Sequence, residues 1–277
     1  MLLLVLRLVS APLVILGATM AQRRFGHAVS GLIVGLPLTS LPLLWLVALG
    51  HGTPFAGSMS AALLMASSAQ AALIWSYARL ARHLSPLAAT TGSIAVFAVV
   101  ALLTRALHPS TPVAALLGVV SCVLALRAWP TLDAAPVVEG RYRIGVRVTL
   151  VTLFTLVVVT FAGSMGPQLA GLVAALPALS LVMAIVTHRE LGASAASHFL
   201  RSVTRGSVAY VISMLVMTEL LRAGLLTLAV VGALIGALVV QASLHLGEQW
   251  TAGPRARRLA SRHVSSPVGE LDDVASR

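Results

Sequence analysis

Nine long apolar segments, separated by short polar connections, leave this chain few ways to fold. The segments cover residues 3–21, 28–49, 58–78, 85–104, 111–129, 146–163, 168–187, 206–221 and 225–246. A helix of about 20 apolar residues is long enough to cross the hydrocarbon core of a bilayer. Lipid offers the backbone no hydrogen bonds, so apolar runs of this length fold there as helices. We therefore predict an all-α, polytopic transmembrane helix bundle of nine spans.

A shortage of charge supports a membrane location. Charged residues make up 10% of the 277 residues, whereas soluble proteins carry about 25%. The first segment could be a secretory signal, but Arg23 and Arg24 follow it, and a signal peptide carries its charge before its apolar run. We expect this segment to be retained. Cys122 is the one cysteine, which excludes an intramolecular disulfide and a multi-cysteine metal site.

The arginines follow the alternation of the spans. The net charge of +11 comes from 19 arginines without a lysine, placed between apolar segments or in the tail. This distribution is typical of a topology signal, and we expect no nucleic-acid partner. Connections after odd-numbered segments are basic, and those after even-numbered segments are nearly bare. Because basic loops stay in the cytoplasm, we predict a multi-pass inner (plasma) membrane protein with its N-terminus outside and its C-terminus in the cytoplasm.

One apolar decamer occurs twice, 140 residues apart. Gly31–Ser40 reads GLIVGLPLTS, and Gly171–Ser180 reads GLVAALPALS. The same shift superposes the first four apolar segments on the last four. It pairs these residues: Gly26 with Gly166, Gly31 with Gly171, Leu32 with Leu172, Leu36 with Leu176, Pro37 with Pro177 and Ser40 with Ser180. The pattern predicts an internal duplication.

The two copies are predicted to be inverted. Five spans separate equivalent points, and an odd number reverses the direction across the membrane. The charges agree, because Arg23 and Arg24 face an uncharged segment of the second copy. The resulting inverted 5+4 repeat has four parts: repeat one at 1–130 with five helices, a cytoplasmic linker at 131–145, repeat two at 146–246 with four helices, and a disordered cytoplasmic tail at 247–277.

Pro37 and Pro177 lie in the middle of two apolar segments, where proline removes a backbone donor and breaks a helix. The freed carbonyls near residues 33 and 173 then need partners, which the nearby serine and threonine hydroxyls could supply. In inverted-repeat transporters, interrupted segments at equivalent positions indicate the substrate site. The alternative is that these prolines only bend helices for packing.

Polar residues at equivalent positions extend this candidate site. Gln70 and Tyr210 match across the two copies and could hydrogen-bond across a cavity or link two helices. Gly31, Gly35 and Gly171 would let neighbouring helices approach closely. The predicted substrate-binding residues are Pro37, Thr39, Ser40, Gln70, Pro177, Ser180 and Tyr210.

Acidic residues are absent from the middle of every predicted span. Proton and sodium coupling usually depend on a carboxylate or histidine within the membrane, so we expect a neutral, amphipathic or weakly charged solute. The sequence has no nucleotide-binding loop, no metal-ligand spacing and no catalytic pair deep in the spans. We therefore expect no enzymatic activity, no cofactor and no metal.

A five-span unit duplicated upside down resembles the drug/metabolite transporter superfamily. The resemblance lies in span count and repeat order, although this chain has nine spans rather than ten and an outside N-terminus. The bile-acid/auxin-carrier type of inverted repeat is less similar, because its broken helices are the fourth of each unit rather than the second. The decamer itself resembles a decamer of bacterial integral membrane proteins. These resemblances imply no functional residue.

The sequence thus predicts a bacterial permease or exporter of a small, largely uncharged or amphipathic solute, which works by alternating access between the repeats. Its partners would be the lipid bilayer and the solute. A homodimer is a further possibility. A non-transporting membrane complex subunit and a lipid-interacting protein or flippase are the alternatives. A carrier needs a cavity lined by both decamers, a flippase needs a groove open to the bilayer, and a subunit can pack solid.

Overall fold

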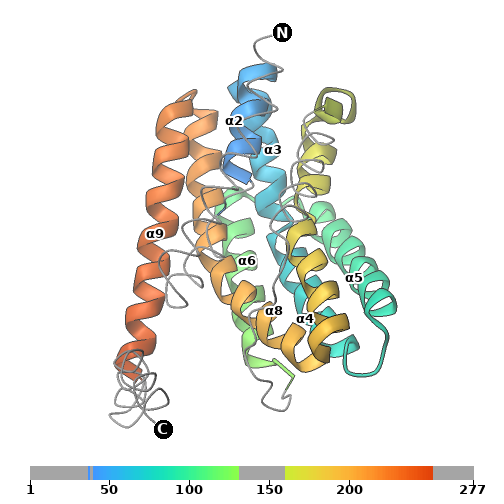
Figure 1. Cartoon of the computed structure of the whole chain (residues 1–277). Helices are drawn as coiled ribbons and strands as arrows, with labels where there is room; N and C mark the ends of the chain where they lie inside the picture. Colours follow the sequence, from blue (N-terminus) through green and yellow to red (C-terminus); the bar gives the residue numbers. More distant parts are fainter. Residues whose placement is uncertain (1–36, 38–39, 131–159, 252–277) are drawn as a thin grey trace, which may run out of the picture.

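The computed structural model describes residues 37, 40–130 and 160–251, and these residues form helices without a strand. The helices are α2 (Ser40–His51), α3 (Thr53–Met65), α4 (Ser67–Leu80), α5 (Pro86–Ala106), α6 (Thr111–Arg127), α8 (Ala178–Arg222) and α9 (Leu226–Thr251), with a further helical stretch at 160–174 (Figure 1). Several predicted parts lie outside the described residues: segment 3–21, the first part of 28–49, the linker, most of 146–163 and most of the tail.

Four helices of the described part are long and apolar enough to cross a membrane: Thr53–Leu80, Pro86–Ala106, Ser180–Arg222 and Leu226–Leu244. They contain the predicted segments 58–78 and 206–221 and most of 85–104 and 225–246. α2 and α6 are apolar but shorter, with 12 and 17 residues. The all-helical fold is therefore confirmed, and the long apolar helices fit a membrane protein.

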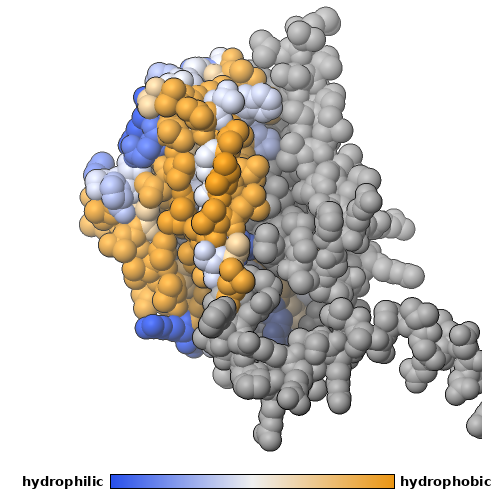
Figure 2. All heavy atoms as spheres, turned by 90° about the vertical axis from the view of Figure 1, so that its left-hand side faces the viewer, coloured by the Kyte–Doolittle hydropathy of each residue, from blue (hydrophilic) through white to orange (hydrophobic). Residues whose placement is uncertain are grey.

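The long helices divide into a central pair and a peripheral pair. In an apolar 18-residue window of each helix, the share that is buried is 78% for Thr53–Leu80 and 50% for Ser180–Arg222. The share is only 28% for Pro86–Ala106 and 22% for Leu226–Leu244. The peripheral pair has the higher mean hydropathy, 2.1 against 1.3 and 1.2. This difference is expected if the outer helices meet lipid, because a helix in contact with lipid has to be apolar on its outer side too. Figure 2 shows such an apolar face, with hydrophilic residues toward both ends of the bundle.

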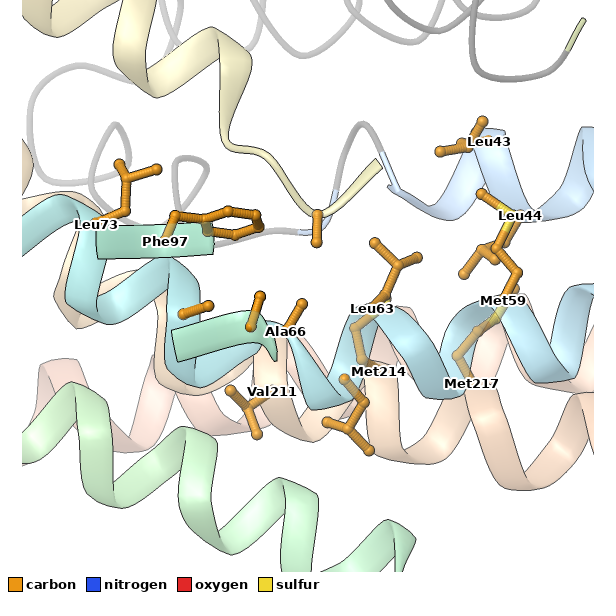
Figure 3. Packing of buried hydrophobic residues seen from close by; sticks show 14 of the residues in the cluster. Leu43, Leu44, Met59, Leu63, Ala66, Leu73, Phe97, Val211, Met214 and Met217 are labelled. Atoms are coloured by element: carbon orange, nitrogen blue, oxygen red, sulfur yellow. The ribbon is translucent and has the colours of Figure 1, made fainter. Parts of the chain in front are cut away.

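The core lies where α3 and α4 pack against the second part of α8. Leu63 and Met214 are fully buried there and lie close together (Figure 3). The helix at 160–174 approaches α3 closely: a Cβ on Gly171 would lie 2.6 Å from the Ala62 Cβ and from the Met59 carbonyl oxygen. Close contact of this kind drives helix association in lipid, and the sequence predicts it at Gly171.

Each of the two matched prolines stands just before a helix. Pro177 has φ −78° and ψ 61°, the conformation of an inverse γ-turn, and the Ala178 N–H donates to the carbonyl two residues back at 2.7 Å. The 160–174 helix therefore ends, and α8 starts at Ala178. In the first half, the Leu41 N–H donates to the Pro37 carbonyl at 3.0 Å, immediately after α2 begins. The predicted interruption at Pro177 is thus present in the described chain.

Two glycine corners have the same 140-residue spacing. Gly52 separates α2 from α3 with φ 86° and ψ 162°, and Gly192 kinks α8 with φ 89° and ψ 172°. Residues other than glycine avoid this backbone region. Beyond Gly192 the chain runs as one helix to Arg222, so the predicted segment 206–221 is only the end of a longer helix. The turns before residue 206 were not predicted as part of an apolar segment, because Arg201 and Arg205 lower the hydropathy there. Both arginines are exposed.

The peripheral helices α5 and α9 repeat one burial pattern at the same spacing. The buried positions that match are Ala89 with Ala229, Ser93 with Ala233, Phe97 with Ala237, and Ala101 with Gln241. A Cβ on Gly92 would meet Leu80 Cδ1 at 2.8 Å, and one on Gly232 would meet Leu220 Cδ1 at 3.2 Å. α5 and α9 run in opposite directions: α5 runs upward in Figure 1, and α9 runs downward from the top.

Candidate functional site

The interruption before Pro177 frees backbone carbonyls from the helix, and those of Val173, Ala175 and Leu176 have identified partners. The Leu176 N–H donates to the Val173 carbonyl at 3.1 Å. The side-chain amide of Gln70, on α4, donates to the Ala175 carbonyl at 2.5 Å. A glutamine from another helix thus takes the role that the sequence suggested for nearby hydroxyls, and it ties α4 to the interrupted segment.

Tyr210 lies on the long part of α8, and its hydroxyl is buried. Among the described residues this oxygen has no hydrogen-bond partner. The side chains of Ser40 and Gln70 are within interaction range of it, but neither meets the geometry of a hydrogen bond. A buried hydroxyl without a partner costs about 1–3 kcal/mol of stability, so its retention calls for an explanation.

These contacts bring the starts of two helices to one place. Ser40 is the first residue of α2 and is buried, and it faces Tyr210. Gln70 links the same group to Ala175, three residues before the start of α8. Figure 3 shows the extended end of the 160–174 segment approaching the start of α2, near Leu63.

The structure places the other predicted site residues as follows. Pro37 is buried, and Pro177 and Ser180 are half-buried at the start of α8. Thr39 lies outside the described residues, as do the packing glycines Gly31 and Gly35. The Ala175 carbonyl was missed, because a backbone acceptor leaves no mark in the sequence beyond the proline that frees it.

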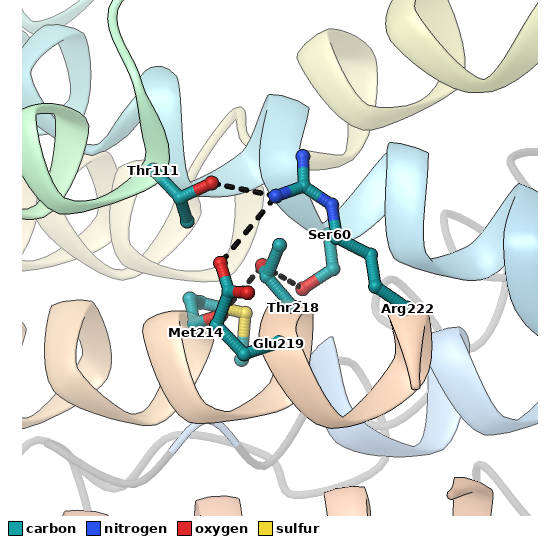
Figure 4. A network of polar contacts seen from close by, with 6 residues as sticks. All are labelled: Ser60, Thr111, Met214, Thr218, Glu219 and Arg222. Atoms are coloured by element: carbon teal, nitrogen blue, oxygen red, sulfur yellow. Dashed lines mark hydrogen bonds and ion pairs between the residues drawn. The ribbon is translucent and has the colours of Figure 1, made fainter. Parts of the chain in front are cut away.

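A polar network closes one end of the contact between α3 and α8 (Figure 4). The Ser60 and Thr218 hydroxyls share a buried hydrogen bond of 2.9 Å. Arg222 donates to Thr111 at 2.7 Å and lies 3.4 Å from Glu219. Arg222 and Glu219 are three residues apart on one helix, a spacing at which opposite charges meet, whereas the bonds between distant helices have no such local cause.

The opposite end of the bundle is closed by aromatic side chains. The Trp75 indole donates to the Ala128 carbonyl at 3.0 Å, and the Trp129 indole donates to the Ser197 hydroxyl at 3.0 Å. These bonds hold the end of α6 against α4 and α8. Both tryptophans are therefore hydrogen-bonded within the bundle.

A small cavity of about 40 Å³ opens between α3, α5 and the 160–174 helix. Its lining is Ala62, Met65, Ala66, Ala101, Thr104, Arg105, Gln168 and Leu172. A water molecule needs about 10–15 Å³ on this measure, so the cavity holds a few waters. It is too small for an organic solute.

Comparisons with protein family models, with curated proteins and with solved structures found no match. Among the described residues, no three His, Cys, Asp or Glu side chains lie close enough to hold a metal ion.

Proposed function

We propose that this protein is a membrane permease or exporter of a small, largely uncharged or amphipathic solute. The solute would bind where the two interrupted segments meet. The observation that carries the proposal is the buried Tyr210 hydroxyl, which lacks a partner and faces Ser40 and Gln70 beside the break at Pro177. A hydrogen-bonding group of a solute would satisfy it.

The proposed architecture is an inverted 5+4 repeat of nine spans in the inner membrane. It is supported by the matched corners at Gly52 and Gly192, by the matched burial on α5 and α9, and by the opposite directions of these two helices (Figure 1). In such repeats the solute site lies near the midplane, at the interface of the halves. Alternating access would then move one half against the other around this site.

A non-transporting subunit and a flippase are the alternatives. The described cavity is lined by Leu172 of the second decamer and by no residue of the first, which a solidly packed subunit also allows. In a protein that only packs, Gln70 and Tyr210 would serve as links between helices and would both be paired. Gln70 is paired with the Ala175 carbonyl, but the Tyr210 hydroxyl is not paired within the described chain. A flippase would need a groove wide enough for a lipid headgroup on its lateral face, and the cavity beside α5 holds only a few waters.

The function can be tested with proline variants in a strain that lacks the gene. Small molecules in cells and medium are compared by mass spectrometry after expression of the wild type, Pro177→Ala or the control Pro86→Ala. Pro86 lies in the first turn of α5, outside the site, where proline suits a helix. We expect one class of solute to return to the parental level with the wild type and Pro86→Ala only. Normal levels with Pro177→Ala, inserted in equal amount, would contradict the assigned site.

The inverted arrangement needs a separate test. Single cysteines are introduced at Arg24 and His188 in a Cys122→Ser background and labelled in intact cells with a membrane-impermeant thiol reagent. Both positions follow odd-numbered segments of the sequence, so both are expected to be cytoplasmic and protected. Labelling of one but not the other would refute the inverted repeat.

A further inference from the structure

The proposed solute site is built mainly from hydrogen-bond donors. We infer that the solute it takes is a small amphipathic carboxylate, with its anionic end between the starts of α2 and α8 and its apolar end toward the core. This inference rests on the proposed function and narrows the class of solute.

The start of α8 contributes backbone donors. The first N–H groups of a helix have no partner within the helix, and no side chain caps this one, because its N-cap residue is Pro177. The helix from Ala178 to the kink at Gly192 is long enough to carry a helix dipole, whose positive end favours anions. Ser180, in the first turn, adds a hydroxyl at the same end.

The start of α2 provides a second positive end. α2 has 12 residues and begins at the buried Ser40, which faces the Tyr210 hydroxyl. That hydroxyl is the independent sign of a ligand, because it is buried, directed at the start of α2 and without a partner in the described chain. The Tyr210 hydroxyl is thus linked to the start of α2 through Ser40 and to the segment before α8 through Gln70 and Ala175, an arrangement that resembles carboxylate sites in broken-helix transporters.

The groups around this point exclude other classes of solute. The side chains identified beside the Tyr210 hydroxyl are the Ser40 hydroxyl and the Gln70 amide, and neither offers a negative charge to a cation. The core that α2 and α3 contribute is apolar, with Leu44 and Leu63 fully buried, so we expect the remainder of the solute to be apolar. Partial charges without a fixed cation bind an anion weakly enough to release it, as conduction and transport require.

The test uses butyrate and butyramide, which have nearly the same shape but differ in charge. Purified full-length protein in nanodiscs is heated with either compound, with sodium chloride as the ionic-strength control. A ligand that binds only the folded state raises the unfolding midpoint in proportion to its affinity. We expect butyrate to raise the midpoint and butyramide to leave it unchanged.

The matched variants are Tyr210→Phe and Tyr77→Phe. Loss of a hydrogen bond to a charged group weakens binding about tenfold or more, so Tyr210→Phe should need at least tenfold more butyrate for the same shift. Without ligand it should be more stable than the wild type, because it removes a buried hydroxyl that has no partner. Tyr77, on α4, lies near His188 of α8, away from the site. Tyr77→Phe should therefore respond to butyrate as the wild type does.

Three outcomes would overturn the inference. If butyramide shifts the midpoint and butyrate does not, and the shift depends on Tyr210, the solute is neutral and the proposed permease site stands. If butyrate shifts the wild type and Tyr210→Phe equally, the anion binds elsewhere. If neither compound shifts the midpoint while the export assay still depends on Pro177, only the carboxylate assignment fails.

Discussion

Replacing Gly192 with alanine isolates the energetic cost of one backbone conformation. Gly192 has φ 89° and ψ 172°, and a Cβ added there would have no heavy atom within 4 Å. The variant therefore creates no steric clash, and any loss of stability comes from the backbone alone. Gly52→Ala is a second test of the same kind, because Gly52 has φ 86° and its added Cβ would lie 3.6 Å from Pro54 Cδ, an ordinary contact.

The expected loss of stability follows from the positive φ of Gly192, compared with the helical conformation of a control glycine. A non-glycine residue in this region costs about 1–3 kcal/mol. Gly236 is the matched control, because it lies within α9 and its added Cβ would be 3.8 Å from Val216 Cγ2. Alanine in a helix interior is more stable than glycine by about 0.5–1 kcal/mol. Gly192→Ala and Gly236→Ala should therefore differ by about 2–4 kcal/mol in the free energy of unfolding.

The assay is a reversible denaturant titration of the full chain in detergent micelles, followed by helix content. Gly52→Ala and Gly192→Ala should lose similar amounts of stability, whereas Gly236→Ala should gain. The reasoning is refuted if Gly192→Ala is as stable as Gly236→Ala. A loss at only one of the two corners would show that their geometries are not energetically equivalent.

Two further changes test the packing and the polar core. Gly171→Ala should lose about 1–3 kcal/mol in the same titration, because its Cβ would lie 2.6 Å from the backbone oxygen of Met59, which cannot move aside alone. Thr218→Val should cost about 1 kcal/mol, because it leaves the buried Ser60 hydroxyl without its 2.9 Å partner. Adding Ser60→Ala should recover part of that loss in a double-mutant cycle, and strict additivity would show that the bond contributes nothing.

The sequence predicted the elements whose cause is local. Pro177 ends a helix because it lacks an N–H and has a fixed φ, and this holds whatever surrounds it. The segments 85–104 and 225–246 were close to the ends of α5 and α9, because helices that face lipid are apolar on every side. The central helices are less uniform, so the predicted segment 206–221 began 14 residues after the Gly192 corner.

The candidate site could be predicted only in part, because its contacts join distant segments. Gln70 and Tyr210 were selected for their equivalent positions, but the partner of Gln70 is a carbonyl 105 residues away. A sequence does not show which carbonyl a glutamine reaches, nor that the Tyr210 hydroxyl is left without a partner. The Gly52–Gly192 match was visible at the 140-residue spacing, yet its meaning depends on a backbone conformation that any of the 22 glycines could have had.

Several of the residues that stay identical across the proposed repeat have a backbone that restricts the choice. Gly52 and Gly192 occupy a region open to glycine alone, and Pro177, like its counterpart Pro37, precedes a helix start. At other buried positions the residue type changes while burial is kept, as where Phe97 is matched by Ala237, because lipid and a small-residue core accept many side chains. A duplicated membrane bundle can therefore lose nearly all its internal similarity and still keep its broken helices. For the same reason, the proposed solute site depends first on where the helices break and only then on the side chains, such as Tyr210, that face the break.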